Sequence, residues 1–383
     1  MTRIAYTGAR IFDGEAFWER SALVVDRDRI EGIIAADSQT TAERVPLEGG
    51  ILAPGFVDLQ VNGGGGAQFN LAPTVETIAT ICSTFARFGT TACLPTLITD
   101  TRETTATAIA AGIAAVQQGV PGFLGLHLEG PHLSVARKGA HDPALIRPMD
   151  EADLVALVDA RAKLPNLLTT VAAETVTPNQ ITRLREAGVV VSIGHSNASY
   201  AIVRAAAEAG ASMVTHLFNA QSQLGNRDPG VVGAALDLGS LWAGLIADGI
   251  HVDAASIGVA LRAKRGPSRI FLVTDAMAPT GTDEETFELT GRTVYRKDGA
   301  LRLADGTLAG ADLTMVDAVA YAHRTLGLAL EETLRMAARY PSQAIGDGRR
   351  GVIENGARAD LVHLSDDLAV RRTIIAGLTV WTA

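Results

Sequence analysis

The sequence predicts an α/β protein: a (β/α)8 barrel of the TIM type joined to a small β-sandwich that both ends of the chain build. In the middle of the chain, eight short apolar runs alternate with amphipathic helical segments. That alternation is typical of repeated βα units with a parallel sheet, and eight such units close a barrel. At both ends the helical period disappears, and short strands with tight turns take its place.

The two β-rich ends predict one domain assembled from both termini. Strands are expected at 10–12, 22–25 and 30–34, with turns at 13–14 and 26–29. From about residue 351 the pattern returns, with a turn at Asn355-Gly356 and strands at 360–364 and 372–381. We therefore expect a β-sandwich domain of residues 1–52 with 346–383 and a barrel domain of 53–345, which the length of 383 residues allows.

The barrel strands are expected in the apolar runs 51–57, 90–95, 122–128, 168–173, 189–194, 211–215, 241–247 and 269–274. Helix signals lie between them. Thr74 precedes an apolar helical face that Gly89 ends, Thr177-Pro178 opens another helix, and Asp150 with Asp153 resembles a capping box.

Composition and charge exclude several classes of protein. Hydrophobic residues make up 47% and charged residues 20% of the chain, which excludes disordered, collagen-like and coiled-coil chains. The net charge of -9 argues against a nucleic-acid partner. Two cysteines do not form a disulfide scaffold, and no run predicts a signal peptide or a membrane span. We expect a cytoplasmic protein that acts on a small molecule, without membrane or nucleic-acid partners.

Polar residues gather where the predicted strands end, which is where barrel enzymes carry their catalytic groups. Six of the eight histidines fall between residues 127 and 251, at or near such ends. The strand-end residues are Asp58, Gln60, His127, Glu129, His132, Glu174, His195, His216, Asp248, His251 and Asp275.

Three of these residues suit a metal. A histidine at a strand end is by itself more often structural, but Glu129, His195 and His216 together offer one carboxylate and two imidazoles from different strands. This donor set favours Zn²⁺, with Fe²⁺ or another divalent metal as the alternative. Asp275 would lie near the barrel axis, where it could act as general base, or else it would cap the next element.

Two further features allow both a functional and a structural interpretation. The run Gly63–Gly66 lacks the spacing and the lysine of a phosphate loop, so we expect a tight loop with its backbone close to a ligand. Arg227 could clamp an anion, although a lone arginine is more often part of a surface ion pair.

Several strings, in order along nearly the whole chain, resemble the N-acetylglucosamine-6-phosphate deacetylase family of the amidohydrolase superfamily. They are PGFVDLQVNGGGGAQFN at 54–70, LHLEGPHL with RKGAH within 126–141, IGHSNA at 193–198, THLFNA at 215–220, NRDPG at 226–230, ADGIHVD at 247–253, VTDAM at 273–277 and LAGADLTM at 308–315.

The resemblance implies the fold stated above, a homodimer, and hydrolysis of N-acetyl-D-glucosamine 6-phosphate to D-glucosamine 6-phosphate and acetate. It implies metal ligation by Glu129, His195 and His216 and an acid/base role for Asp275. Our hypothesis for the mechanism adds that the metal and His141 hold the oxyanion. The resemblance also implies that Arg227 reaches the sugar phosphate in the neighbouring subunit. The implied substrate contacts are Ala140, His141, Asn219, Ala220, Arg227, Asp248, His251, Leu308, Ala309, Gly310 and Ala311.

The chain departs from its relatives at three places. The segment Asp58-Leu59-Gln60 stands where two-metal relatives often carry His-x-His, so we expect Asp58 and Gln60 to be a remnant of a second site and the protein to bind one metal. Strand four ends in Glu174 instead of a carboxylated lysine, and Gln221 replaces a common methionine.

Three alternatives stay open on the sequence alone. The orientation of one sugar hydroxyl is not encoded in any motif, so N-acetylgalactosamine 6-phosphate is an alternative substrate. The others are a deaminase or cyclic amidase, which the RDPG and KGAH strings disfavour, and a barrel that binds amino-sugar phosphates without catalysis.

Overall fold

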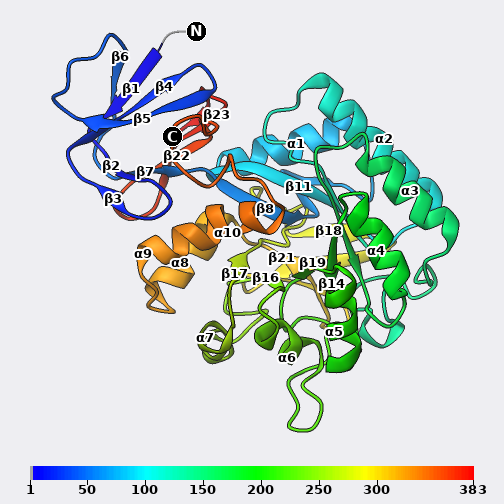
Figure 1. Cartoon of the computed structure of the whole chain (residues 1–383). Helices are drawn as coiled ribbons and strands as arrows, with labels where there is room; N and C mark the ends of the chain where they lie inside the picture. The colour runs from blue at the N-terminus through cyan, green and yellow to red at the C-terminus, as the bar shows by residue number, and fades with distance from the viewer. Residues whose placement is uncertain (1–2) are drawn as a thin grey trace.

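In the computed structural model, which describes residues 3–383, a parallel barrel forms the centre of the molecule (Figure 1). Its eight strands follow one another around the sheet in chain order. They are β8 (Phe56–Val61), β11 (Thr90–Ile98), β12 (Leu126–Glu129), β13 (Leu167–Val171), β14 (Val190–Ile193), β15 (Met213–Val214), β16 (Trp242–Leu245) and β17 (Ile270–Leu272). The predicted fold class is confirmed.

Backbone hydrogen bonds between the first and last strands close the barrel. The amide of Asp275 donates to the carbonyl of Gln60 at 3.0 Å, and the amide of Asn62 donates to the carbonyl of Ala276 at 2.8 Å. Val61 and Ala276 form a parallel bridge between these bonds. Closure therefore places residues about 60 and about 275 side by side.

Helices cover the outside of the barrel, and the expected helix starts at 74, 150 and 177 are confirmed. Thr74 caps α1, and α3 and α4 each begin with a capping box. The helices are α1 (Val75–Ala86), α2 (Arg102–Gln118), α3 (Glu151–Arg161), α4 (Pro178–Glu186), α5 (Tyr200–Ala209), α6 (Gly230–Asp237), α7 (Ala254–Ala263), α8 (Met315–Arg324), α9 (Leu330–Leu334) and α10 (Tyr340–Ala344). Among the described residues, no helix has both the length and the apolar character needed to cross a membrane.

The run predicted at 51–57 as one barrel strand is instead two strands. Residues Ile51–Pro54 form β7, which pairs with strands from both chain ends, and the barrel strand begins only at Phe56. Between them the amide of Gly55 donates to the carbonyl of Asp360, so the chain leaves one sheet for the other there. Both strands are buried, so hydrophobicity alone could not separate them.

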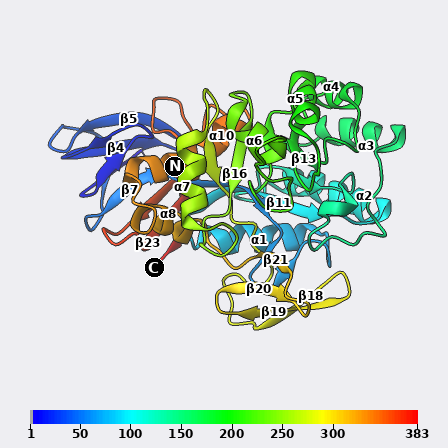
Figure 2. The same ribbon diagram turned by 90° about the horizontal axis from the view of Figure 1, so that it is seen from below.

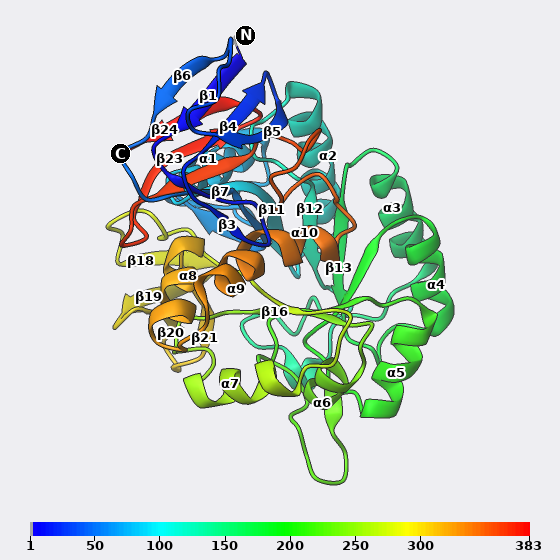
Figure 3. The ribbon, with the colours of Figure 1, turned by 60° about the vertical axis from the view of Figure 1, so that its left-hand side comes forward.

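Two sheets from the chain ends form the terminal sandwich, in which the first and last described strands lie close together (Figure 3). Leu23, Leu52 and Ile374 belong to one buried core between the sheets. One sheet holds β1 (Arg3–Thr7), β4 (Ser21–Asp26), β5 (Arg29–Ala35) and β6 (Glu43–Pro46), and the other holds β2 (Arg10–Phe12), β3 (Phe17–Trp18), β7, β22 (Leu361–Leu364), β23 (Val370–Ile375) and β24 (Leu378–Thr382).

The predicted single strand at 372–381 is wrong, because this segment is the hairpin β23–β24. Ala376 and Gly377 have φ values of 52° and 75°, which turn the chain back on itself. Two successive residues with positive φ are the geometry of a tight hairpin turn. The prediction missed the turn because only one of the two residues is a glycine.

A four-stranded antiparallel sheet inserted after β17, here called the insert, was not predicted. It comprises β18 (Thr286–Leu289), β19 (Arg292–Lys297), β20 (Ala300–Leu303) and β21 (Leu308–Ala311). Figure 2 shows it projecting beyond the barrel. Its turns Thr290-Gly291 and Asp298-Gly299 have positive φ at both residues. An Asp-Gly pair between alternating strands is a hairpin signal that could have identified it.

The glycine run at 63–66 forms a tight hairpin, but its backbone does not line the cavity at the barrel mouth described below. The hairpin joins β9 (Gly63–Gly64) and β10 (Ala67–Gln68). A Cβ on Gly64 would lie 2.6 Å from the ring of Phe85 on α1, and one on Gly65 would lie 2.3 Å from the Thr84 hydroxyl. The glycines thus allow close packing on α1, and the expected approach of their backbone to a ligand stays a prediction.

Candidate active site at the barrel mouth

One cavity of about 370 Å³ collects most of the predicted site residues at the C-terminal ends of the strands. Loops after β12, β14, β15, β16 and β17 contribute to it, as does the insert. The predicted residues that line it are Glu129, Ala140, His141, His195, His216, Asn219, Ala220, His251, Asp275, Leu308, Ala309 and Gly310.

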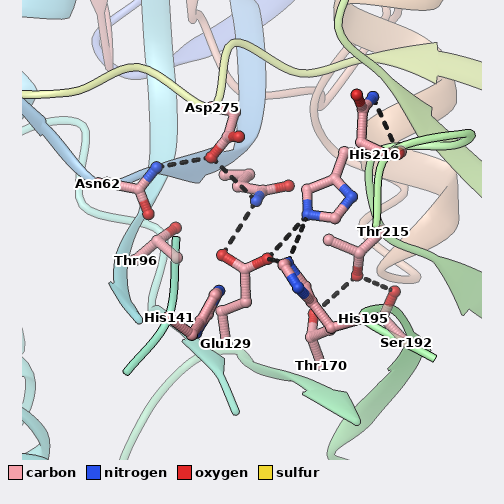
Figure 4. Close-up of polar contacts among 12 residues, drawn as sticks. Asn62, Thr96, Glu129, His141, Thr170, Ser192, His195, Thr215, His216 and Asp275 are labelled. Atoms are coloured by element: carbon pink, nitrogen blue, oxygen red, sulfur yellow. Dashed lines mark hydrogen bonds and ion pairs between the residues drawn. The ribbon is translucent and has the colours of Figure 1, made fainter. Parts of the chain in front are cut away.

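Glu129, His195 and His216 line this cavity and point toward one another (Figure 4). Glu129 Oε1 lies 3.1 Å from His195 Nε2 and 2.9 Å from His216 Nε2, and the two imidazole nitrogens lie 3.1 Å apart. All three side chains are buried. The expected donor set is therefore brought together from three strands.

The chain turns sharply at the strand ends to direct these side chains inward. His195, His216 and Asp275 have φ values of 46°, 28° and 52°. Such values are uncommon for residues with a Cβ, and they tend to occur at functional sites. Each residue follows its strand by two or three positions, so the turn directs its side chain into the mouth of the barrel.

The hydrogen bonds around this cluster fit a bound cation. His195 Nδ1 lies 2.8 Å from the carbonyl oxygen of Arg137, which can only accept, so Nδ1 carries the proton and Nε2 presents a lone pair. That lone pair faces a carboxylate oxygen. Although burial would raise the pKa of Glu129, its close contacts with His195 and His216 hold that pKa well below its usual range. An ionised carboxylate with two imidazoles is a donor set for a divalent metal.

His141 is close to the cluster but is suited to a different task. Ligand atoms of Glu129, His141 and His195 lie within 4.8 Å of one another, so distance alone would admit His141 as a ligand. However, the backbone N–H of Thr99 points at His141 Nδ1 at 3.3 Å, which leaves the ring proton on Nε2. Burial lowers the pKa of His141 to about 3. The neutral ring can therefore donate a hydrogen bond from its Nε2–H into the cavity.

Asp275 is oriented by two amide side chains from β8 and its end (Figure 4). Its Oδ1 accepts from Asn62 Nδ2 at 2.6 Å and from Gln60 Nε2 at 3.1 Å. Gln60 Nε2 also lies 3.2 Å from Glu129 Oε2. Burial, and then the charge of Glu129, raise the pKa of Asp275 to about 6. Asp275 is thus a buried carboxyl group beside the metal-ligand cluster, and it does not cap a helix.

Asp58 lies deeper in the barrel than the site. It is fully buried and accepts from the Thr274 hydroxyl at 2.5 Å, and burial raises its pKa to about 7. Residues 58 and 60 share one face of β8 and residue 62, directly after the strand, continues it; each step of two residues rises about 7 Å. Gln60 and Asn62 therefore reach the cluster, whereas Asp58 links the first strand to the last.

Other strand-end residues serve local structure. Glu174 accepts from the Ser196 hydroxyl and the Asn197 amide, both at 2.6 Å, and so holds the loop after β14. His127 lies below the cluster, bonded to Thr170 at 2.7 Å, and His132 bonds to the carbonyl of Arg147 at 3.1 Å.

Three predicted substrate contacts do not line the cavity within one chain. Asp248 instead binds His251 Nδ1 through Oδ2 at 2.6 Å and so orients that ring, and Ala311 is buried behind Gly310. Arg227 lies in an exposed stretch, 223–228, of the loop that leads into α6 and projects from the body (Figures 1 and 3).

Several cavity residues were missed by the sequence analysis. Asn62 follows Gln60 at the spacing of one strand face, which was a usable signal. The others had no such signal, since they come from the unpredicted insert or from apolar strand ends. They include Ile98, Met277, Leu289, Arg302 and Thr307. In the described part of the chain, Arg302 is the one arginine or lysine that lines the cavity.

A closed barrel with a Glu/His₂ cluster and an adjacent buried aspartate defines a class, the barrel hydrolases that work with a divalent metal. Comparisons with known proteins agree. Residues 51–380 match the amidohydrolase family. The chain is 42% identical to an N-acetylgalactosamine-6-phosphate deacetylase from Shewanella sp. (strain ANA-3), covering 98% of this chain and 95% of that protein.

Two further relatives carry a related name. An N-acetylglucosamine-6-phosphate deacetylase from Haemophilus influenzae is 36% identical over 93% of both chains. The crystal structure of an N-acetylglucosamine-6-phosphate deacetylase from Pasteurella multocida superimposes with a TM-score of 0.95 at 38% identity over the full length of both chains. The chain therefore belongs to the amidohydrolase family, in the branch of the N-acetylhexosamine-6-phosphate deacetylases.

The metal site can be tested by exchanging one strand-end glutamate for its amide. We expect Glu129→Gln to lose most of the bound metal, because the charged ligand is removed from between two histidines. Glu186→Gln, an exposed glutamate at the end of α4, is the control and should keep the wild-type metal content. Elemental analysis of both purified variants is the measurement, and equal metal content in the two would contradict the assigned site.

Proposed function

We propose that the protein removes the N-acetyl group from N-acetyl-D-glucosamine 6-phosphate, giving D-glucosamine 6-phosphate and acetate. The observation that carries this proposal is the Glu129, His195 and His216 cluster beside Asp275 in one cavity. The full-length similarity to deacetylases of amino-sugar phosphates supports it. The substrate is accordingly a small anionic amide.

Glu129, His195 and His216 would hold one divalent metal, for which we propose Zn²⁺, with Fe²⁺ as the alternative. A divalent metal supplies Lewis acidity, which polarises an amide carbonyl and makes hydroxide available near neutral pH. All three side chains line the cavity, so a metal that they held would be accessible to water and substrate, as catalytic sites require. His195 is kept in its ligating tautomer by the carbonyl of Arg137.

Asp275 would act first as general base and then as general acid. Asn62 and Gln60 both bind its Oδ1, so Oδ2 is left to take a proton from the attacking water. A pKa near 6 lies close to neutral, where a group can both accept and return a proton efficiently. The protonated Asp275 would then deliver this proton to the departing amine.

His141 would hold the oxyanion of the tetrahedral intermediate. Its Nδ1 accepts from Thr99, so the Nε2–H is directed toward the cavity as a donor. A preorganised neutral donor in a buried site stabilises charge that develops during the reaction. Thr99 is thereby a positioning residue for the oxyanion donor.

The sugar phosphate would lie toward the loops after β15 and β16. Asn219 and Ala220 line that side of the cavity, together with His251, whose ring Asp248 orients. We propose a homodimer in which Arg227, on its exposed loop, binds the phosphate in the neighbouring subunit. Leu308, Ala309 and Gly310 of the insert would contact the sugar, and Ala311 would support them. We propose that the enzyme works in the cytoplasm.

N-acetyl-D-galactosamine 6-phosphate is a second candidate substrate, because the relative at 42% identity is named as its deacetylase. The two sugars differ only in the orientation of one hydroxyl group. Acetate release should be measured with both 6-phosphates and with unphosphorylated N-acetylglucosamine, on protein of known metal content. We expect the gluco 6-phosphate to give the highest kcat/KM. A higher value for the galacto isomer would favour the second candidate, and absence of acetate release from all three would overturn the proposal.

The role of Asp275 predicts a variant that binds metal but is nearly inactive. Asp275→Asn keeps the size of the side chain, but the amide cannot take a proton from water. We expect wild-type metal content with kcat lowered by about 10²-fold or more. Steady-state kinetics and elemental analysis on the same preparation check this prediction, and near-normal turnover would assign the acid/base role elsewhere.

The phosphate contact predicts a separate effect on KM. Arg227→Ala should raise KM by about tenfold or more with little change in kcat, because the contact is remote from the scissile bond. Arg302→Ala is the comparison, because Arg302 lines the cavity and could bind the phosphate within the same subunit. If only Arg302→Ala raises KM, the phosphate is held within one subunit and the role of Arg227 is refuted.

A further inference from the structure

One wall of the active-site cavity is apolar and closed. Ile98, Met277 and Leu289 line the cavity, and their exposed fractions are only 5%, 2% and 1%. They belong to one buried cluster that continues behind the wall into the insert, with Phe287, Val294, Leu301, Leu303 and Ala309. The wall therefore has packed side chains behind it and is not exposed to solvent on its far side.

This wall lies next to the reacting groups. Ile98 is the register partner of Glu129 across β11 and β12, and Met277 follows Asp275 by two residues. Leu289, at the end of β18, joins them from the insert. An amide carbon held between Glu129 and Asp275 would thus be adjacent to apolar side chains.

The polar side of the cavity is opposite. Ile98 ends β11, whereas Asn219 and Ala220 follow β15, four strands away in the eight-stranded sheet. In a closed barrel of eight strands, strands four apart face each other across the axis. The carbonyl carbon of the substrate carries two substituents, a hydroxyl-rich amino sugar and an alkyl group. Only the alkyl group can leave water for an apolar wall without losing hydrogen bonds.

We propose that Ile98, Met277 and Leu289 form the acyl-binding wall of the enzyme and restrict its substrates to short N-acyl groups such as acetyl. The inference rests on the deacetylase function proposed above and adds to it the residues that limit the length of the acyl group. The amino sugar then extends toward Asn219 and His251.

The insert is fixed firmly enough to set a length limit. Arg296 on β19 forms a bidentate ion pair with Asp312 at 2.6 and 2.7 Å. Arg292, at the start of β19, donates to the carbonyl of Ala140, beside His141. Leu289 pairs directly with Arg292 across the hairpin, so its position is linked to the loop that carries Ala140 and His141. A close-packed wall of this kind cannot absorb an added methylene without strain.

The experiment measures acyl-length preference with N-acetyl, N-propionyl and N-butyryl glucosamine 6-phosphate. The readout is the ratio of kcat/KM for each longer acyl group to that for acetyl, which does not depend on the fraction of active protein. In the wild type we expect each added methylene to lower kcat/KM by about 10 to 200-fold. Leu289→Ala should raise the propionyl-to-acetyl ratio at least tenfold, and Met277→Ala is the second variant if Leu289→Ala does not fold.

Leu301→Ala is the matched control, because Leu301 lies in the same buried cluster but does not line the cavity. It should lose comparable packing and leave the ratio unchanged. An unchanged ratio in Leu289→Ala and Met277→Ala, or a wild type that hydrolyses the propionyl amide as well as the acetyl amide, would overturn the acyl wall. Either result leaves the deacetylase function intact, whereas a wild type that releases no acetate removes both.

Discussion

The site depends on closing the barrel between its first and last strands. The backbone bonds of Gln60 and Asn62 with Asp275 and Ala276 join segments more than 200 residues apart in the chain. Because these bonds set the register, Gln60 and Asn62 meet the carboxylate of Asp275. One level deeper, Asp58 makes the same connection through Thr274, so a buried polar layer supports the catalytic one.

The ends of β12, β14 and β15 bring together a buried carboxylate and two imidazoles, whose charge a cation or protons would balance. Glu129 presents a carboxylate oxygen to two imidazole nitrogens, all within 3.1 Å of one another and all buried. Burial would lower the pKa of His216, but the hydrogen bond and charge of Glu129 outweigh that effect and raise it. The same attraction that draws a proton to this cluster in the absence of metal draws a divalent metal to it. Asp275 stands beside this charge as a separate carboxyl group, held by neutral amides.

The groups proposed to carry out the chemistry belong to the barrel, whereas the insert supplies one side of the cavity lining. All the groups proposed to handle metal, water and protons come from strand ends or the loops directly after them. The insert supplies Leu289, Arg302, Thr307 and the segment Leu308–Gly310, none of which carries a reactive group at the cluster. This division allows substrate choice to change without disturbing the ligand geometry, a recurring property of barrels whose loops vary on a constant framework.

Residue order and periodicity determined much of this protein. Alternating apolar runs and helical segments predicted the barrel, and histidines and carboxylates at strand ends predicted Glu129, His195, His216 and Asp275, because strand direction alone brings those ends to one mouth. Capping motifs predicted three helix starts, because a cap is a local interaction.

Tertiary structure decided the features that depend on a residue's depth within the barrel and on pairing between segments distant in the chain. The division of residues 51–57 between two sheets was not predictable, because both strands are equally buried. The position of Asp58 below Gln60 and Asn62 was not predictable either, because strand register depends on pairing with distant segments. Asn62 as the partner of Asp275, and the apolar wall of Ile98, Met277 and Leu289, depend on contacts across 179 to 213 residues where the chain folds back. Such contacts have no period and no motif, so only the closed barrel and its insert reveal them.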